Sequence, residues 1–331
     1  MIRCLLGRSG SGKNVLSRML FLLSFPAAGQ APQANLSDSS VIRLADPAIF
    51  YHSGTYYLYG TVEGNSNGGF WVYTSQRLRH WKRDTGKEGY ALNKGEAFGT
   101  AGFWAPQVFR SGPRFYMAYT ANEQIALAEA DRPEGPFLQK TIAPLQAPVK
   151  QIDPFVFQDD DGKKYLYHVR LQEGNSIYVA ELEDDLSAIK PETLRSCIRA
   201  TEPWENTQSV PWPVAEGPSV LKRKGIYYLF YSANDFRNPD YAVGYATSNS
   251  PLGPWTKYAG NPVLHRRHLG ENGTGHGDFI AGKKGPLLYV FHTHDSGQKV
   301  GPRKTAIIRF RFRNGAFRIQ EKTFRFLRSG R

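Results

Sequence analysis

The feature that most constrains the fold is a hairpin-like segment that occurs five times along the chain. The first copy, "LADPAIFYHSGTYYLYGT", begins at Leu44, and the others begin at Phe103, Gln151, Ala215 and Gly275. Each copy joins a short stretch containing an acid, Pro or Gly to an apolar strand, a polar turn and a second, aromatic strand. Aligned on Pro47, Pro106, Pro154, Pro218 and Asp278, the copies lie 59, 48, 64 and 60 residues apart. This spacing predicts one supersecondary unit used five times.

A second pattern recurs between these hairpins. Residues 125–137 ("IALAEADRPEGPF") and 243–255 ("VGYATSNSPLGPW") share a strand, a polar bend and a Gly-Pro-aromatic end, and looser versions occupy residues 71–83, 177–189 and 306–319. Each unit therefore holds about four strands. Radial repetition of four-stranded units predicts an all-β fold, a five-bladed β-propeller. A sandwich gives no reason for the motif to repeat, and solenoid repeats are normally shorter.

The propeller geometry predicts where the functional site lies. The innermost strand of each blade lines the central channel, so residues at the start of successive inner strands converge on one pocket. The residues at these starts are Asp46, Trp104, Asp153, Glu216 and His276. Three carboxylates, an indole and an imidazole facing one another would be costly if they served only packing.

Carboxylates gathered without a Cys or Ser nucleophile motif favour acid–base hydrolysis or metal binding. Glycoside hydrolysis needs two carboxyl groups, of which one is protonated and the other is ionised. A third carboxylate close by raises the pKa of the acid, because like charges resist joint ionisation. Asp46, Asp153 and Glu216 meet this requirement from three separate blades.

The first 31 residues differ from the rest of the chain. Basic residues without any acid precede the apolar run "MLFLLSF", and "PAAGQA" supplies small residues for cleavage. This order predicts a secretory signal peptide at residues 1–31, a single catalytic domain at 32–331, and a secreted or periplasmic location. The run is too short to span a bilayer. The nearby "GRSGSGKN" is not a phosphate-binding loop, because Asn14 replaces the magnesium-holding Ser or Thr and no strand precedes it.

The net charge of +13 raises the question of a nucleic-acid partner. Ten Lys or Arg residues and one Glu lie within residues 303–331. However, Ile308 and Phe310 alternate there with Arg309 and Arg311, which is typical of a strand with one solvated face. We therefore expect no nucleic acid as a partner, no membrane span and a monomeric protein.

The motifs "ADP", "WAP", "IDP" with "DDDGKKYLY", and "EGP" with "YYLFYS", in this order, resemble glycoside hydrolase family 43. The resemblance covers about residues 41–319. It implies a five-bladed propeller that hydrolyses arabinofuranosyl or xylosyl linkages with inversion of configuration. It also implies that Asp46 is the general base, that Glu216 is the general acid, and that Asp153 tunes and orients the acid.

The same resemblance implies further site residues. Trp104 would cover the apolar face of a pentose, and Arg303 would bind sugar hydroxyls. Residues 203–218, which lead into the acid, depart from the family pattern and hold Trp204 and Trp212. Either can line a subsite, and we expect Trp212 to do so. His276 would hold a structural calcium ion in the central channel, and no cofactor would take part in the chemistry. The expected partners are carbohydrates, namely fragments of arabinan, arabinoxylan or xylan.

Two alternatives remain open at this point. The first is a propeller glycosidase acting on galactan or fructan. The fructan-acting family places Asn before its Asp-Pro and Cys after its acid, whereas Ala45 and Gly217 stand at these positions here. The second is a non-catalytic carbohydrate-binding propeller, which would lose one or more acids. The sugar, its linkage and the choice between exo and endo action are not fixed by these patterns.

Overall fold

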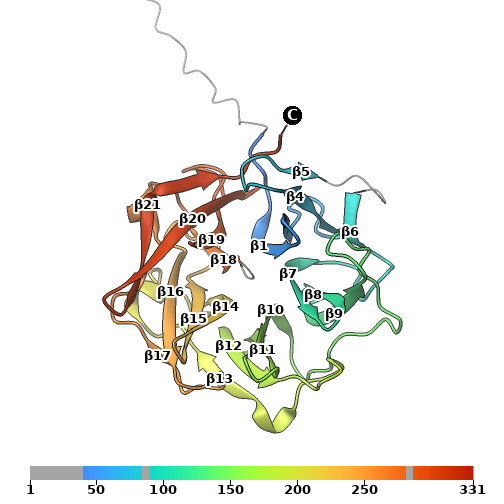
Figure 1. Cartoon of the computed structure of the whole chain (residues 1–331). Helices are drawn as coiled ribbons and strands as arrows, with labels where there is room; N and C mark the ends of the chain where they lie inside the picture. The colour runs from blue at the N-terminus through green and yellow to red at the C-terminus, as the bar shows by residue number, and fades with distance from the viewer. Residues whose placement is uncertain (1–39, 84–88, 281–285, 331) are drawn as a thin grey trace, which may run out of the picture. The chain divides into compact units, whose positions relative to one another are not determined.

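Antiparallel sheets surround a central axis in the computed structural model, which describes residues 40–83, 89–280 and 286–330 (Figure 1). The chain passes once around this axis, from the first blade, drawn in blue, to the last, drawn in red. The predicted five-bladed β-propeller is confirmed. The signal peptide expected at residues 1–31 lies outside the described residues.

The first two blades deviate from the four-stranded unit in opposite ways. Blade 1 pairs its strands in the order β1-β2-β4-β5, and a two-stranded ribbon, β3-β6, lies outside that sheet. Blade 2 has three strands, and an isolated bridge between Glu129 and Leu138 extends it. The strands are β1 (Ala45–His52), β2 (Thr55–Thr61), β3 (Gly69–Trp71), β4 (Tyr73–Ser75), β5 (Lys82–Arg83), β6 (Tyr90–Asn93), β7 (Trp104–Ser111), β8 (Arg114–Ala121) and β9 (Gln124–Ala130).

Blades 3 to 5 each have four antiparallel strands in chain order. Their strands are β10 (Gln151–Gln158), β11 (Lys164–Leu171), β12 (Asn175–Glu181), β13 (Arg195–Ile198), β14 (Ala215–Arg223), β15 (Ile226–Ala233), β16 (Ala242–Ser248), β17 (Thr256–Lys257), β18 (Gly275–Phe279), β19 (Leu287–Thr293), β20 (Lys304–Arg313) and β21 (Ala316–Phe326). Single helical turns occur at η2 (Pro191–Thr193), η3 (Pro203–Glu205) and α1 (Arg266–Leu269). No helix in the described ranges is long and apolar enough to cross a membrane.

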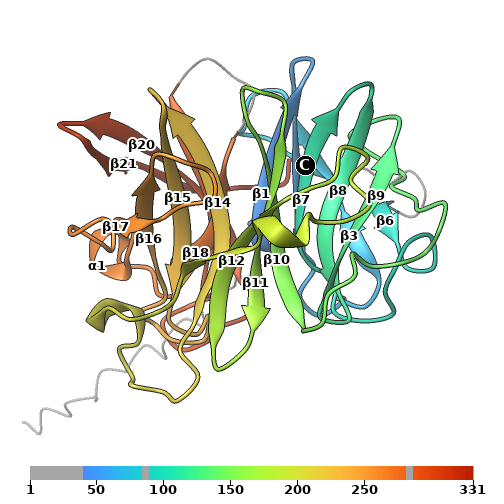
Figure 2. The same ribbon diagram turned by 90° about the horizontal axis from the view of Figure 1, so that it is seen from below.

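The apolar core is divided among the junctions between blades. The described part of the chain forms five clusters of buried residues, and each joins side chains from two neighbouring blades. The inner strands contact one another in the order β1, β7, β10, β14, β18 and back to β1. Figure 2 shows the neighbouring inner strands β10 and β14 side by side. Each blade packs against a neighbour on both of its faces, and this explains why aromatic residues recur on both faces of each hairpin.

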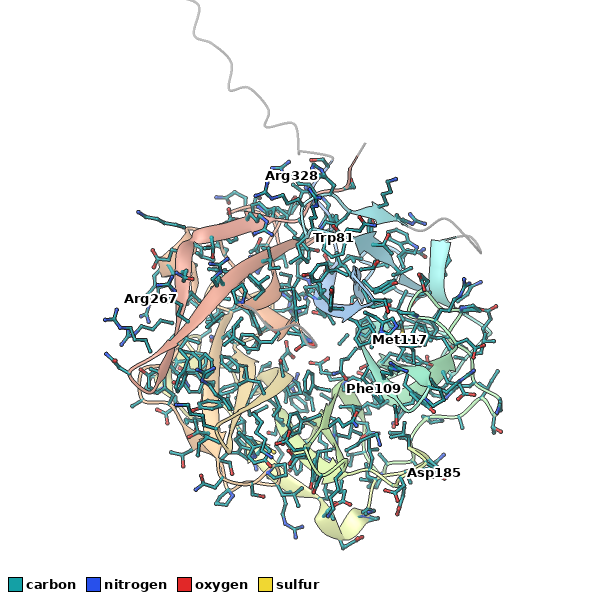
Figure 3. The ribbon with its side chains drawn as sticks, in the orientation of Figure 1. Trp81, Phe109, Met117, Asp185, Arg267 and Arg328 are labelled. Carbon is teal, nitrogen blue, oxygen red and sulfur yellow. The ribbon has the colours of Figure 1, made fainter. Side chains whose placement is uncertain are left out.

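The ends of the described chain join the last blade to the first. Ile42 N–H donates to the Leu327 carbonyl at 2.9 Å, and Gly330 N–H donates to the Trp81 carbonyl at 2.8 Å. Leu327 itself is 1% exposed in the cluster shared by blades 5 and 1. Figure 3 labels Trp81 and Arg328 at this junction. Closure depends on backbone bonds and on one buried apolar patch.

Each inner strand carries a β-bulge near its start. The antiparallel register skips two residues at Asp46–Pro47 and at the matching place in every other blade. The first residue of each bulge has a positive φ, a conformation that costs free energy for residues other than Gly. These φ values are 48° at Asp46, 46° at Ala105, 55° at Asp153, 58° at Gly217 and 40° at His276.

The bulges correct the sequence alignment in two places. Gly277, and not Asp278, corresponds to the prolines of the other four blades, because Gly277 follows His276 within the bulge. Trp104 and Glu216 lie one residue before their bulges, whereas Asp46, Asp153 and His276 lie within theirs. The five predicted residues therefore occupy two adjacent positions, which direct their side chains differently.

Leu327→Ala tests the closure of the ring. We expect the free energy of unfolding to fall by about 2–5 kcal/mol, because the change leaves a cavity between the last and first blades. Urea denaturation provides the measurement. The matched control is Leu138→Ala, since Leu138 is 41% exposed and its loss should change stability by less than about 0.5 kcal/mol. Equal effects of the two changes would contradict the role given to Leu327.

Candidate active site

A cavity of about 390 Å³ opens at the end of the channel where the inner strands start. The three predicted carboxylates all line it. They come from β1 (Asp46), β10 (Asp153) and β14 (Glu216), so the propeller brings together residues that lie far apart in the sequence. The other lining residues are Thr61, Glu63, Gly64, Ser66, Trp104, Ile152, Phe236, His276 and Arg303.

Asp46 is held as an ionised carboxylate. Its Oδ2 accepts a hydrogen bond from the Thr61 hydroxyl at 2.7 Å, and its Oδ1 lies 3.2 Å from an Arg303 nitrogen. Burial by itself would raise the pKa of Asp46, but Arg303, the imidazoles of His276 and His292 and the Thr61 hydroxyl outweigh it. Together they hold the pKa of Asp46 well below its usual range.

Glu216 has the opposite electrostatic setting. Its Oε1 accepts a hydrogen bond from Tyr241 and its Oε2 accepts one from Asn175, both at 2.9 Å. Neither partner carries a positive charge. Burial and the negative charge of Asp46 outweigh these two bonds and raise the pKa of Glu216 to about 7. Asp46 and Glu216 therefore carry different protonation states in one cavity at mildly acidic pH.

Asp153 fills a gap in a five-fold pattern of hydrogen bonds. At four of the five bulges, the N–H of the first bulge residue donates to a side chain of the preceding blade. These acceptors are Thr61 for Ala105, Thr120 for Asp153, Ser232 for His276 and His292 for Asp46. All four acceptors lie on second strands, directly opposite the residue before the bulge of their own blade.

The corresponding position of blade 3 is Val169, whose side chain has no hydrogen-bond acceptor. Asp153 Oδ2 instead accepts the hydrogen bond from the Gly217 N–H, at 3.1 Å. Gly217 follows Glu216 directly, so Asp153 fixes the backbone that carries Glu216. Burial, and next the charges of Glu216 and Asp46, raise the pKa of Asp153 well above its usual range.

His276 lies between two of the carboxylates. Its Nδ1 is 3.4 Å from Asp46 Oδ1 and 3.7 Å from Asp153 Oδ2. Burial lowers the pKa of His276, so the ring is neutral at pH 7. Among the described residues, no group of three or more His, Cys, Asp and Glu side chains is arranged to hold a metal ion. Because calcium takes six to eight oxygen ligands, these side chains alone do not fit it, and calcium at His276 stays a prediction.

The predicted sugar-contacting residues have different surroundings. Trp104 lines the cavity, next to the carboxylates. Arg303 also lines it, but the side chain is 8% exposed and its Nε bonds Glu63 Oε1 at 2.7 Å. Trp212 is 48% exposed, lies outside the lining, and donates from Nε1 to Asn175. Trp204, eight residues earlier in the sequence, instead packs against the core between blades 3 and 4.

Several residues of the site carry no signal in the sequence. Asn175 begins β12, and Tyr241 precedes β16, and neither position belongs to the repeated motif. Their contacts with Glu216 depend on how blades 3 and 4 meet. Thr61 and His292 could have been found, because they lie opposite the bulges in the repeated hairpins. That they accept hydrogen bonds from the bulge N–H groups of the next blade needs the strand register, which the structure gives.

A double-mutant cycle tests the structural role of Asp153. We expect Val169→Thr to stabilise the Asp153→Ala variant by about 1 kcal/mol relative to its effect in the wild type, because the new hydroxyl can accept from Gly217 N–H. Chemical denaturation of the four proteins gives the coupling energy. Additive effects of the two changes would contradict the hydrogen-bond substitution.

The chain is similar in sequence and fold to a protein of known structure. An endo-1,4-β-xylanase from Bacteroides thetaiotaomicron is 42% identical to this chain and has a TM-score of 0.81. The alignment covers 88% of this chain and 98% of that chain.

Characterised relatives carry several activities in their names. A β-D-galactofuranosidase from Aspergillus niger is 27% identical over 57% of this chain and 56% of its own length. An arabinoxylan arabinofuranohydrolase from Bacillus subtilis is 27% identical over 64% of this chain and 48% of its own length. The chain thus spans about half the length of each of these relatives. The profile of Glycosyl hydrolases family 43 matches residues 40–317. The protein therefore belongs to glycoside hydrolase family 43.

Proposed function

We propose that the protein is an inverting glycoside hydrolase that releases α-L-arabinofuranosyl or β-D-xylosyl units from plant polysaccharides or their oligomers. One observation carries the proposal: an ionised Asp46 and a protonated Glu216 line the same cavity. Glycoside hydrolysis by a pair of carboxyl groups requires this division of protonation states. Inversion is the part of the proposal that comes from the family resemblance. The signal peptide expected at residues 1–31 would bring the enzyme to such polymers outside the cytoplasm.

In the proposed reaction, Asp46 accepts a proton from a water molecule as the water oxygen bonds to the anomeric carbon. Glu216 donates its proton to the glycosidic oxygen as the bond from that oxygen to the anomeric carbon breaks. Afterwards Asp46 is protonated and Glu216 is ionised, and exchange with solvent restores both. Asp153 accepts the hydrogen bond from the backbone N–H of Gly217, the residue that follows Glu216, and so orients the acid.

The substrate class rests on the cavity and on the relatives. A volume of about 390 Å³ suits a small glycosyl unit, and Trp104 offers an indole for its apolar face. Arg303 is held by Asp46 and Glu63, so it orients the base and has few free donors for sugar hydroxyls. The names of the relatives include xylan-, arabinofuranosyl- and galactofuranosyl-directed enzymes. We favour pentosyl units, and galactofuranosides are the alternative.

Replacing either reacting carboxylate tests the function. We expect Glu216→Gln and Asp46→Asn each to lower kcat by roughly 10²–10⁴-fold, because each removes one proton transfer. The substrates are nitrophenyl α-L-arabinofuranoside, β-D-xyloside and β-D-galactofuranoside, followed by arabinan and xylan oligomers. The loss in Glu216→Gln is read on the oligomers, because a nitrophenyl leaving group needs little acid assistance.

Circular dichroism should show that both variants are folded. Near-native rates of oligomer hydrolysis in either variant would overturn the assigned roles. Binding of oligosaccharides by the wild type, with no release of reducing sugar across the panel, would instead favour a carbohydrate-binding propeller.

The dependence of kcat/KM on pH follows from the two pKa shifts. The base Asp46 stays ionised down to strongly acidic pH, because its pKa is depressed. The acid Glu216 must be protonated, and its pKa is about 7. We therefore expect kcat/KM to be flat in mildly acidic solution and to fall tenfold per pH unit above about 7. A descending limb that begins near pH 4.5, the ordinary pKa of Glu, would contradict the buried setting of Glu216.

A further inference from the structure

The contact between Asn175 and Glu216 belongs to a longer chain of hydrogen bonds that ends at the surface. Trp212 Nε1 donates to Asn175 Oδ1 at 2.9 Å, and Asn175 Nδ2 donates to Glu216 Oε2 at 2.9 Å. An indole N–H can only donate. It therefore fixes the orientation of the Asn175 amide, with the oxygen toward Trp212 and the nitrogen toward Glu216.

The backbone around Asn175 is built to hold this position. Asn175 N–H donates to the Pro213 carbonyl at 2.9 Å, and Asn175 bridges Val214 in parallel register. A Cβ at Gly174 would lie 2.6 Å from the Pro213 carbonyl oxygen. Only Gly allows so close an approach. The segment that carries Trp212 is thus fastened to the start of β12, on the blade beside Glu216.

The loop before Trp212 is anchored at its far end as well. The buried Glu205 carboxylate accepts hydrogen bonds from Tyr231 and from Lys257, both at 2.5 Å. Asn234 bonds the Trp204 carbonyl and the Thr207 N–H, both at 2.8 Å. Between these anchors and Pro213, the Trp212 ring is 48% exposed. A large, exposed aromatic ring that is held in place and is hydrogen-bonded to the acid through Asn175 can stack on a sugar.

We propose that Asn175 is a positioning residue for the acid, and that Trp212 both fixes the Asn175 amide and binds the sugar of the leaving group. The proposal rests on the proposed function, because it takes Glu216 as the acid. A leaving-group sugar on Trp212 would stiffen the ring, hold the amide in place and direct the Glu216 carboxyl group toward the glycosidic oxygen. The structure thereby couples occupation of the leaving-group subsite to proton donation.

The charged and titratable groups near Glu216 are few. Asn175 donates to the ionised form of Glu216 and so lowers its pKa, as does Tyr241. Loss of the Asn175 donor should therefore raise the pKa of Glu216 and move the alkaline limb of kcat/KM to higher pH. The groups that act on Glu216 from the surrounding elements are Asp46, Asp153, Asp235 and Tyr241.

Four variants separate these contributions. Asn175→Ala removes the amide, and Asn175→Asp keeps the acceptor for Trp212 while it removes the donor to Glu216. Trp212→Phe keeps an aromatic ring but removes the indole N–H. Val210→Ala is the control, because Val210 lies in the same loop and its side chain is 36% exposed. All four are assayed with a nitrophenyl glycoside, which needs little acid assistance, and with an oligosaccharide of the same sugar.

We expect Asn175→Ala to lower kcat on the oligosaccharide roughly tenfold, with a smaller loss on the nitrophenyl glycoside. Asn175→Asp should move the alkaline limb further upward than Asn175→Ala, because a second negative charge faces Glu216. Trp212→Phe should move the alkaline limb of kcat/KM in the same direction but by less, because the Asn175 amide is still present. It should raise KM for the oligosaccharide and not for the nitrophenyl glycoside, which has no leaving-group sugar. Val210→Ala should match the wild type.

The proposal is overturned if Asn175→Ala and Trp212→Phe keep the wild-type pH profile and the wild-type ratio between the two substrates. It is also overturned if both substrates lose activity equally with no shift of the limb, which would mark a merely structural contact. Glu216→Gln, measured in parallel on the oligosaccharide, distinguishes failure of this proposal from failure of the proposed function. If Glu216→Gln stays active on the oligosaccharide, the proposed function itself fails.

Discussion

The hydrogen bond from each bulge N–H to the preceding blade is the interaction on which the site depends. The bulge places its first residue at a positive φ, and in four blades a side chain of the neighbouring blade accepts that residue's N–H. A buried N–H without a partner is costly. The bond therefore sets the angle at which one inner strand meets the next, and it fixes where the side chains at the strand starts converge.

The exception to this pattern accounts for part of the chemistry. Val169 leaves the Gly217 N–H without its usual acceptor, and Asp153 supplies the acceptor. A carboxyl group thus enters the site by accepting a bond that a hydroxyl or an imidazole accepts at the other bulges. Burial and the negative charge of Asp46 raise the pKa of Glu216. In contrast, Arg303 and its partners surround Asp46 and favour ionisation. The opposite protonation of two chemically similar groups follows from their different neighbours.

The sequence was sufficient to predict the fold and the positions of the three carboxyl groups in the cavity, because the repeated hairpin motif contains the information for both. The repeat also placed Trp104 and His276 at the cavity. It misaligned Asp278, since the fifth copy has Gly277 where the others have proline. It gave no signal for Asn175 or Tyr241, whose contacts depend on the packing of separate blades. Arg303 was identified by resemblance, and Trp212 from its place in the segment before Glu216. Their hydrogen bonds to Glu63 and Asn175 needed coordinates.

The central claim is that burial and neighbouring charge keep Glu216 protonated near neutral pH. The most direct test is the free energy of unfolding of the wild type and of Glu216→Gln as a function of pH. The pKa of Glu216 in the fold, about 7, exceeds its ordinary value of 4.5, so the wild type loses stability relative to the variant as pH rises between these values. We predict a difference on the order of 3 kcal/mol that develops over this interval and is constant above it. A difference that does not change with pH would contradict the account.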